Sequence, residues 1–252
     1  ADKFHKSANL KRVLDHLLGQ GIFTSDGELW QKNRKLVGPA FHTKRIGAYA
    51  DVITAYATDM VDSWREGQTI EIDHQMSVLT MRIISKILFD AEVGADSDTI
   101  SAAVTDALKV VNDRLNRFMF APRWIPTSEN RRYFSAIDRL ETLIYRFIND
   151  RRKSGEDKGD VLSMLLQAQS DDGEGMTDYQ IRSEALTLFG AGHETTAVAL
   201  TWTLYLLSQH PDIATRLQEE VGRVLDGRAP ELSDLPNLVY TEQIIKEAMR
   251  LY

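Results

Sequence analysis

The sequence predicts a mainly α-helical protein. Along most of its 252 residues, apolar side chains recur at the three-to-four-residue spacing of an amphipathic helix. Glycine and proline interrupt this spacing at intervals, as they do where helices end. Only Thr69 to Ile72 alternates in the manner of a strand, so we expect at most a short strand near 69–72. Because the apolar share of 43% is ordinary for a globular protein, such helices can bury a sizeable core.

Three helical segments are predicted before residue 66. Residues 8–18 have helical spacing and end at the glycines that follow. Ser25, with Glu28 three residues later, resembles a capping box that opens a helix ending before Gly38-Pro39. The amphipathic pattern then returns over residues 43–65.

A long central helix dominates the rest of the pattern. Thr177 and Gln180 form a second predicted capping box, from which a helix runs to about His210. Pro211 stops that helix and opens another, which ends near Leu225. The last helical pattern starts near Tyr240. Shorter helices are expected over residues 74–89, 97–112, 129–153 and 160–169.

Composition removes several classes of function. The net charge of −7 does not favour nucleic-acid binding. The absence of cysteine excludes disulfides, cysteine-ligated zinc and a cysteine nucleophile within these residues. The chain begins at Ala1 with no signal peptide and stops at Tyr252 inside a helical pattern, so we expect a fragment cut at both ends.

Residues 185–207 are apolar enough to suggest a membrane span, but His193 and Glu194 lie at the centre of that window. A charge at the bilayer midplane costs about 2.5–3.5 kcal/mol, so we expect no span here. His193-Glu194 also begins like the zinc-protease motif His-Glu-x-x-His. Ala197 stands where the second histidine is required, so a zinc hydrolase is disfavoured. A core helix that uses small residues for close packing stays open.

A functional interpretation of the same helix starts from its geometry. Thr187, Ala191 and Thr195 are four residues apart and share one face. Ala191 and Gly192 remove bulk, so a flat group could lie against the helix. Thr195 offers a hydroxyl that donates and accepts, and Glu194 offers a neighbouring carboxylate. Together they are suited to a proton relay.

Three short motifs then give a specific resemblance. Residues 191–196, Ala-Gly-His-Glu-Thr-Thr, resemble the central-helix motif of the cytochrome P450 family of haem-thiolate monooxygenases. Trp30 and Arg34 resemble its Trp-x-x-x-Arg helix, and Glu247 and Arg250 its Glu-x-x-Arg helix. The three occur in the family's order over residues 20–252. The resemblance implies an incomplete cytochrome P450-like helical fold, with residues 1–252 forming one partial domain.

The resemblance implies haem b (iron protoporphyrin IX) as cofactor. Trp30 and Arg34, one helical turn apart, would both donate hydrogen bonds to a haem propionate. The alternative for this pair is an exposed cation–aromatic contact worth about 0.5–1 kcal/mol. Thr195 and Glu194 would be the catalytic residues, which handle dioxygen and its protons. The cofactor-binding residues would be Trp30, Arg34, Phe41, Ala191, Gly192 and Thr196.

Other roles also follow from the resemblance. Phe23 would line the substrate pocket together with Thr187, although a hydrophobe that packs at the helix entry is an equal alternative for Phe23. Glu247 and Arg250 would have a structural role, since they brace the core in the family. A surface pair of that spacing is otherwise common and nearly neutral.

The implied reaction is the activation of O₂ and the insertion of one oxygen atom into an apolar organic substrate. Electrons would come ultimately from NAD(P)H through a ferredoxin, a flavodoxin or a flavoprotein reductase. Basic residues crowd an acid-free stretch between Leu29 and Ala50, and we expect them to dock an acidic electron donor. A cytoplasmic enzyme is expected. The docking residues would be Lys32, Lys35, Lys44 and Arg45.

One departure from the family concerns the iron ligand. The family holds iron through a cysteine in a loop downstream of the Glu-x-x-Arg helix, and this chain has no cysteine. We therefore expect no metal ligand in this chain and no activity from it alone. The alternative function is a non-catalytic helical module that binds haem or a lipid.

Overall fold

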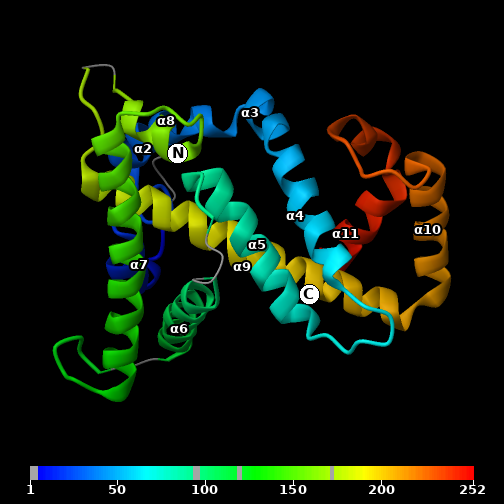
Figure 1. Cartoon of the computed structure of the whole chain (residues 1–252). Helices are drawn as coiled ribbons and strands as arrows, with labels where there is room; N and C mark the ends of the chain where they lie inside the picture. The colour runs from blue at the N-terminus through cyan, green and yellow to red at the C-terminus, as the bar shows by residue number, and fades with distance from the viewer. Residues whose placement is uncertain (1–4, 93–96, 118–120, 171–172) are drawn as a thin grey trace. The chain divides into compact units, whose positions relative to one another are not determined.

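The computed structural model describes residues 5–92, 97–117, 121–170 and 173–252 (Figure 1). Over these ranges the chain forms eleven α-helices and short 3₁₀ helices. The only β pairing described is an isolated antiparallel bridge between Gln169 and Gly175. The mainly helical architecture predicted from the sequence is therefore confirmed.

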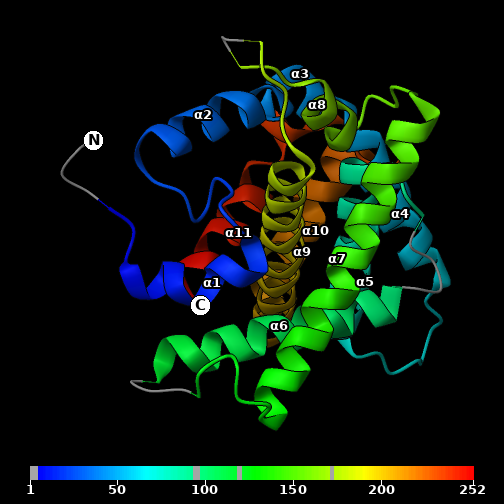
Figure 2. The same cartoon turned by 90° about the vertical axis from the view of Figure 1, so that its left-hand side faces the viewer.

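The chain divides into two compact units. Unit 1 contains residues 1–42 and 85–191, and unit 2 contains residues 43–84 and 192–252. Two helices run through both units: α5 (Ile72–Phe89) and α9 (Asp178–Gln209). α9 is drawn in yellow in Figure 1 and is seen nearly end-on in Figure 2. The candidate motif of residues 191–196 lies where α9 leaves unit 1.

Unit 1 is built on a long helix, α7 (Ser128–Ser154), which packs along α6 (Ser97–Asn116). Thr127 caps α7 by accepting the Asn130 N–H at 3.1 Å. Gly155 ends α7 in the left-handed conformation that favours glycine. The remaining elements of unit 1 are α1 (Ala8–Leu18), α2 (Gly27–Val37), η1 (Gly38–Phe41), α8 (Val161–Gln167) and the first part of α9.

Unit 2 contains the start of α5, the second part of α9 and the helices that follow it. Met76, Leu79 and Ala197 form its buried apolar cluster. Glu220 accepts the backbone N–H groups of Tyr240 and Thr241 at 2.8 Å each, which satisfies donors at the start of the last helix. The other elements of unit 2 are α3 (Thr43–Ala48), α4 (Ala50–Ser63), α10 (Pro211–Leu225), η3 (Leu232–Asn237) and α11 (Val239–Leu251).

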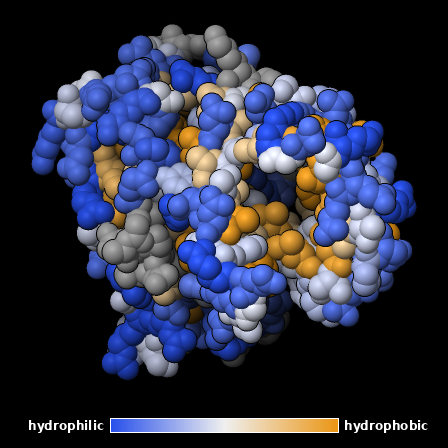
Figure 3. Space-filling view, turned by 45° about the vertical axis from the view of Figure 1, so that its right-hand side comes forward, coloured by the Kyte–Doolittle hydropathy of each residue, from blue (hydrophilic) through white to orange (hydrophobic). Residues whose placement is uncertain are grey.

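Much apolar surface stays open. Orange apolar side chains lie among polar ones on the face drawn in Figure 3. In unit 2 the exposed apolar residues include Val198, Tyr205 and Met249. None of the helices within the described ranges has the length and apolar character needed to cross a membrane.

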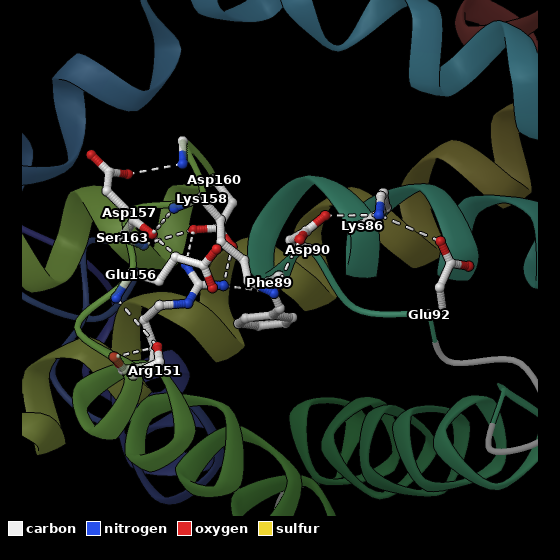
Figure 4. Close-up of polar contacts among 12 residues, drawn as sticks. Lys86, Phe89, Asp90, Glu92, Arg151, Glu156, Asp157, Lys158, Asp160 and Ser163 are labelled. Carbon is white, nitrogen blue, oxygen red and sulfur yellow. Dashed lines mark hydrogen bonds and ion pairs between the residues drawn. The ribbon is translucent and has the colours of Figure 1, made fainter.

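A buried ion pair joins three elements of unit 1 (Figure 4). The Arg151 guanidinium on α7 donates to both carboxylate oxygens of Asp160 at 2.7 Å, and also to the Phe89 carbonyl at 3.1 Å. Asp160 in turn accepts the Ser163 N–H at 2.8 Å and caps α8. This cluster therefore ties α7, α8 and the end of α5 together.

Local predictions met different outcomes. The Thr177–Gln180 capping box is confirmed, with the Thr177 N–H donating to Gln180 Oε1 at 2.8 Å and the Gln180 N–H to Thr177 Oγ1 at 3.3 Å. The Ser25–Glu28 box is wrong, because Asp26 is the residue that precedes α2. The Ser25 hydroxyl donates instead to the Gly21 carbonyl at 2.8 Å.

Two further predictions need correction. The helix expected over 43–65 is split at Tyr49, and Gly47 weakens it there. A Cβ on Gly47 would lie 3.0 Å from Leu232 Cδ2. The short strand near 69–72 is not formed, because residues 68–71 have no strand structure and Ile72 already begins α5. A strand needs a paired neighbour, and the described ranges provide none for this segment.

Candidate active site

The central motif lies within the continuous helix α9. Gly192 faces the neighbouring helix α5, since a Cβ there would stand 2.7 Å from Ile84 Cδ1. The missing side chain thus allows two helices of unit 2 to approach closely, which is the packing role that the sequence left open. Gly190, by contrast, borders open space, because no atom lies within 4 Å of the point where a Cβ would stand.

The predicted face of Thr187, Ala191 and Thr195 is only partly open. Ala191 and Thr195 are exposed, as is Thr196. Thr187 is buried, and its hydroxyl donates to the Ser183 carbonyl at 2.7 Å. The open side of α9 therefore begins one turn later than the spacing alone suggests.

Within unit 2, the open side of α9 forms a groove with α11. The groove has a volume of about 330 Å³, and Glu194 and Thr195 line one end of it. Trp202 and Tyr252 stack face to face with ring centroids 3.8 Å apart. The remaining walls are apolar and come from Val198, Ala199, Ala248 and Met249.

Glu194 is a partly buried acid. Its side chain is 41% exposed, and desolvation raises its pKa above the usual range. A carboxyl group of this kind holds a proton at a higher pH than a solvated one and still exchanges it with water. This combination suits proton transfer.

His193 points the other way and is fully buried. Its Nε2 lies 3.0 Å from the Ser77 hydroxyl on α5, and its Nδ1 lies 3.8 Å from Glu194 Oε2. Burial lowers the pKa of His193, so the ring is neutral at pH 7. The Ser77 contact engages Nε2, one of the two ring nitrogens through which a histidine can bind a metal. Within the described ranges no cluster of three His, Asp or Glu side chains could hold a metal ion.

In unit 1, the predicted haem-binding side chains project outward. Trp30 and Arg34 lie one turn apart on α2, and both are exposed. Among the residues described, neither the indole N–H nor the guanidinium has a hydrogen-bond or ion-pair partner. Phe23 and Phe41 are about half exposed. Two donors without partners among the described residues, in a unit that also exposes two aromatic rings, fit a flat apolar group that carries carboxylates.

Glu247 and Arg250 form a bidentate ion pair on the surface. The Arg250 Nε and Nη2 groups donate to Glu247 at 2.8 and 2.6 Å, and the two side chains are 56% and 65% exposed. This pairing lowers the pKa of Glu247. The geometry shows a salt bridge within α11, and the structural role of the pair stays a prediction.

The predicted docking residues belong to both units. In unit 1, Lys32 Nζ lies 3.5 Å from Glu174 Oε2, and Lys35 is exposed. In unit 2, Arg45 is exposed, while the Lys44 side chain lies outside the described part of the chain. Docking of an electron donor here stays a prediction.

Sequence comparison identifies the family. Residues 2–252 match the cytochrome P450 family along nearly the whole chain. The chain belongs to the cytochrome P450 family. The resemblance inferred from the three motifs is therefore confirmed.

Bacterial monooxygenases are among its relatives. Cyclooctat-9-en-7-ol 5-monooxygenase of Streptomyces melanosporofaciens is 38% identical over 241 residues, which cover 94% of this chain and 52% of that protein. Cyclooctatin synthase of the same species is 38% identical over 249 residues, with shares of 96% and 54%. Pentalenene oxygenase of Streptomyces avermitilis is 32% identical over 239 residues, with shares of 94% and 53%. The chain thus spans about half the length of the curated relatives it matches.

The structure also brings out polar residues that the sequence analysis did not select. Glu184 on α9 is 1% exposed, and burial raises its pKa to about 7. A carboxylate within the long helix that the sequence predicts to be central was the available signal, because such residues are rarely buried without a partner. Ser77, the partner of His193, gave no comparable signal, since nothing local to it indicates a contact 116 residues away.

Proposed function

We propose that the chain supplies the haem-contacting and proton-delivering residues of a haem-dependent monooxygenase, with both units contributing to one domain. The observation that carries this proposal is the groove in unit 2, where the Glu194 carboxyl group, with its raised pKa, adjoins the exposed Thr195. Bound haem b would supply the redox chemistry by which NAD(P)H and O₂ convert an organic substrate to its hydroxylated product and water. The family membership of the whole chain supports this assignment.

In unit 1, Trp30 and Arg34 would bind the haem carboxylates. Both groups only donate hydrogen bonds, and both lack internal partners among the described residues, so a carboxylate would meet no competitor. A hydrogen bond to a charged group contributes about 1.5–3 kcal/mol. Phe41 would pack against the macrocycle, and the open positions Ala191 and Thr196 would lie beside it. The position of Gly192 against Ile84 points to a packing role for this glycine.

In unit 2, Glu194 would hold a proton on its carboxyl oxygen and pass it to Thr195 Oγ1. A threonine hydroxyl can accept one proton and release another, so it transmits protons without changing its own charge. Water at the exposed side of Glu194 would restore the proton. Val198 and Trp202 would keep the far end of the groove apolar.

An apolar organic substrate is the matching substrate class. The groove walls offer few polar groups beyond Glu194 and Thr195. Phe23 adds an exposed aromatic ring in unit 1, and the buried Thr187 stays a proposed residue of the substrate pocket. A ferredoxin, flavodoxin or flavoprotein reductase would deliver the electrons. The cytoplasmic location stays a prediction.

The test uses the complete reading frame that encodes these residues. We expect haem incorporation and NAD(P)H-dependent oxygenation, and we expect Glu194→Gln to lower product formation about a hundredfold while haem content is kept. Glu242→Gln is a suitable control, since Glu242 pairs with Lys246 on α11 and does not line the groove. Haem binding without turnover would instead support the non-catalytic haem-binding module. A Glu194→Gln variant as active as the control would contradict the proton-delivery role.

The iron ligand gives a second test. These 252 residues contain no cysteine, so we expect them alone to lack the Soret band of a thiolate–haem–CO complex. The complete reading frame should show that band. A normal thiolate band from residues 1–252 alone would overturn this part of the proposal.

A further inference from the structure

The segment that carries Phe23 is held mainly by hydrogen bonds that its backbone carbonyl groups accept from side chains. It connects α1 to α2 over residues 19–25, and it leaves α1 through Gly19 with a φ of +60°. The Lys6 ammonium donates to the Ile22 and Ser25 carbonyls at 2.7 and 2.8 Å. Asn33 on α2 donates to the Gln20 carbonyl at 2.9 Å. These contacts hold the segment from the side of the N-terminal residues and α2.

On its other side, the segment lies directly on α9. A Cβ at Gly21 would stand 3.0 Å from Thr187 Oγ1 and 3.1 Å from the Ser183 carbonyl, and a Cβ at Gly19 would overlap the Ser183 hydroxyl. A side chain at Gly19 would clash with α9, and one at Gly21 would fit only tightly, because the backbone lies close to the helix. A small displacement of this segment would therefore change how Phe23 is presented.

Glu184 makes the polar link between α9 and this segment. Its Oε2 accepts the N–H of Ile22, the residue directly before Phe23, at 3.1 Å. Its other oxygen, Oε1, is buried without a hydrogen-bond partner among the described residues. A carboxylate so placed is expensive, because half of its hydrogen-bonding capacity is unused. A neutral apolar residue would fill this place at lower cost, so the acid has a use beyond packing.

The charged surroundings of Glu184 are sparse. Desolvation dominates, and Lys6 is the charged group that opposes it. Lys6 in turn feels Asp26 and Lys11, which form an ion pair with each other. On α9 itself, the adjacent Arg182 is engaged by Glu141 on α7. The other groups against Glu184, from Ser183, Thr187 and the segment, are uncharged. Near neutral pH the carboxyl group is therefore close to half ionised.

We propose that Glu184 is a positioning residue that holds the segment 19–25 on α9 and thereby sets where Phe23 stands beside the substrate. The link to substrate depends on the proposed monooxygenase function, whereas the link between Glu184 and the segment does not. The ionised carboxylate is the stronger acceptor for the Ile22 N–H, but burial opposes its ionisation, so the hold on the segment depends on pH near 7. Product distribution should therefore respond to a side chain that touches no substrate.

Three variants separate these claims. Glu184→Leu removes the acceptor and keeps a buried side chain of similar size. Glu184→Gln keeps an acceptor oxygen and removes the charge. Asp178→Asn is the matched control, because Asp178 is another carboxylate of α9 that pairs with Arg152 away from the segment.

Amide hydrogen exchange, corrected for the intrinsic effect of pH, tests the link without any cofactor. In Glu184→Leu we expect peptides covering 19–25 to exchange about tenfold faster, with residues 27–37 and the Asp178→Asn control unchanged. Parental protection of 19–25 in Glu184→Leu would overturn the proposal. If that variant does not fold, Glu184→Gln decides. The parent must show protection of 19–25 that changes through about pH 7, and Glu184→Gln must lose that change. A change that persists in Glu184→Gln would overturn the proposal.

Turnover by the complete haem-loaded protein tests the role toward substrate. Glu184→Leu should change the ratio of products and raise KM more than it lowers kcat. The double variant Glu184→Leu/Phe23→Ala should match Phe23→Ala alone, because both changes act through one ring. A loosened segment with the parental product ratio would overturn the substrate role and leave the monooxygenase proposal intact. A parent that binds haem and oxygenates nothing would overturn the monooxygenase proposal, while hydrogen exchange would still decide the link.

Discussion

The two parts of the helix α9 differ in their exposure to solvent. In unit 1, residues 181–187 are all buried, and this part includes Glu184 at 1% exposure. In unit 2, the helix opens on one side at Thr195, and Glu194 is 41% exposed. Burial raises the pKa of both glutamates, but only Glu194 can exchange its proton readily with water. A raised pKa alone therefore does not identify a proton donor, since access to solvent is what separates the proposed positioning acid Glu184 from the proposed catalytic acid Glu194.

The contrast extends to the ion pairs of the two units. Arg151–Asp160 in unit 1 is buried and joins three elements, whereas Glu247–Arg250 in unit 2 is exposed and joins one helix to itself. The first needs its partner, because an unpaired buried charge is costly. The second gains little, because water solvates both groups when they separate.

The largest expected effect is on the buried pair. Asp160→Ala leaves the Arg151 guanidinium unpaired and removes the cap of α8, so we expect a loss of about 3–5 kcal/mol in the free energy of unfolding. Urea denaturation followed by circular dichroism measures it. A loss no greater than that of an exposed pair would erase the distinction between the two units.

The next largest effect concerns Glu184, where the substitution should raise the free energy of unfolding and not lower it. Its folded-state pKa of about 7 lies above its usual value of 4.5, so ionisation is disfavoured in the fold. Stability should fall as pH rises from about 4.5 to 7 and then level off, by about 3 kcal/mol in all. Glu184→Gln should escape this loss and be the more stable protein above pH 7. Thermal unfolding across this pH range compares the two, and parallel pH profiles would contradict the assignment.

A glycine pair compares the two parts of α9 directly. Gly192→Ala places a methyl group against Ile84, so we expect a loss of about 1–3 kcal/mol. Gly190→Ala meets nothing within 4 Å and should gain about 0.5–1 kcal/mol from helix propensity. Denaturant midpoints of the two single variants give the answer. Equal shifts of the same sign would show that Ile84 does not limit the space at Gly192.

The smallest effect is expected at the exposed pair. Glu247→Ala should leave the denaturation midpoint unchanged within error, because both side chains of the pair are mostly solvated. A substantial loss of stability would show that Glu247 has partners beyond Arg250, as the family resemblance implies. This measurement would therefore sharpen the boundary between structural and surface roles in unit 2.

Local patterns were enough to predict most of the helices. Pro211 and the Thr177–Gln180 box mark boundaries through interactions within a few residues, and the structure places helix ends there. The Ser25 prediction was wrong because the hydroxyl can either accept a backbone N–H as a helix cap or donate to a nearby carbonyl, and in the structure it donates to the Gly21 carbonyl. The prediction of a strand near 69–72 was wrong because an alternating pattern describes one strand alone and does not show that a second strand is present to pair with it.

For the candidate site, the sequence indicated residue types, but spacing alone could not predict which way their side chains face. Spacing placed Thr187 on the same face as Thr195, yet only the packing of the segment 19–25 shows that Thr187 is covered. The missing side chain of Gly192 could make room for a ligand or for a neighbouring helix. Only the position of Ile84, which is far away in sequence, distinguishes the two. Contacts between residues far apart in sequence, such as Ser77 with His193, produce no periodic pattern from which they could be predicted.

The stacked rings of Trp202 and Tyr252 allow the groove of unit 2 to be followed by tryptophan fluorescence. An indole in van der Waals contact with a phenol ring has its emission set by that neighbour, and both rings line the groove beside Thr195. A molecule that contacts either ring would change the emission of Trp202. A titration could therefore follow occupancy of the groove as a change in Trp202 emission above that of the other three tryptophans.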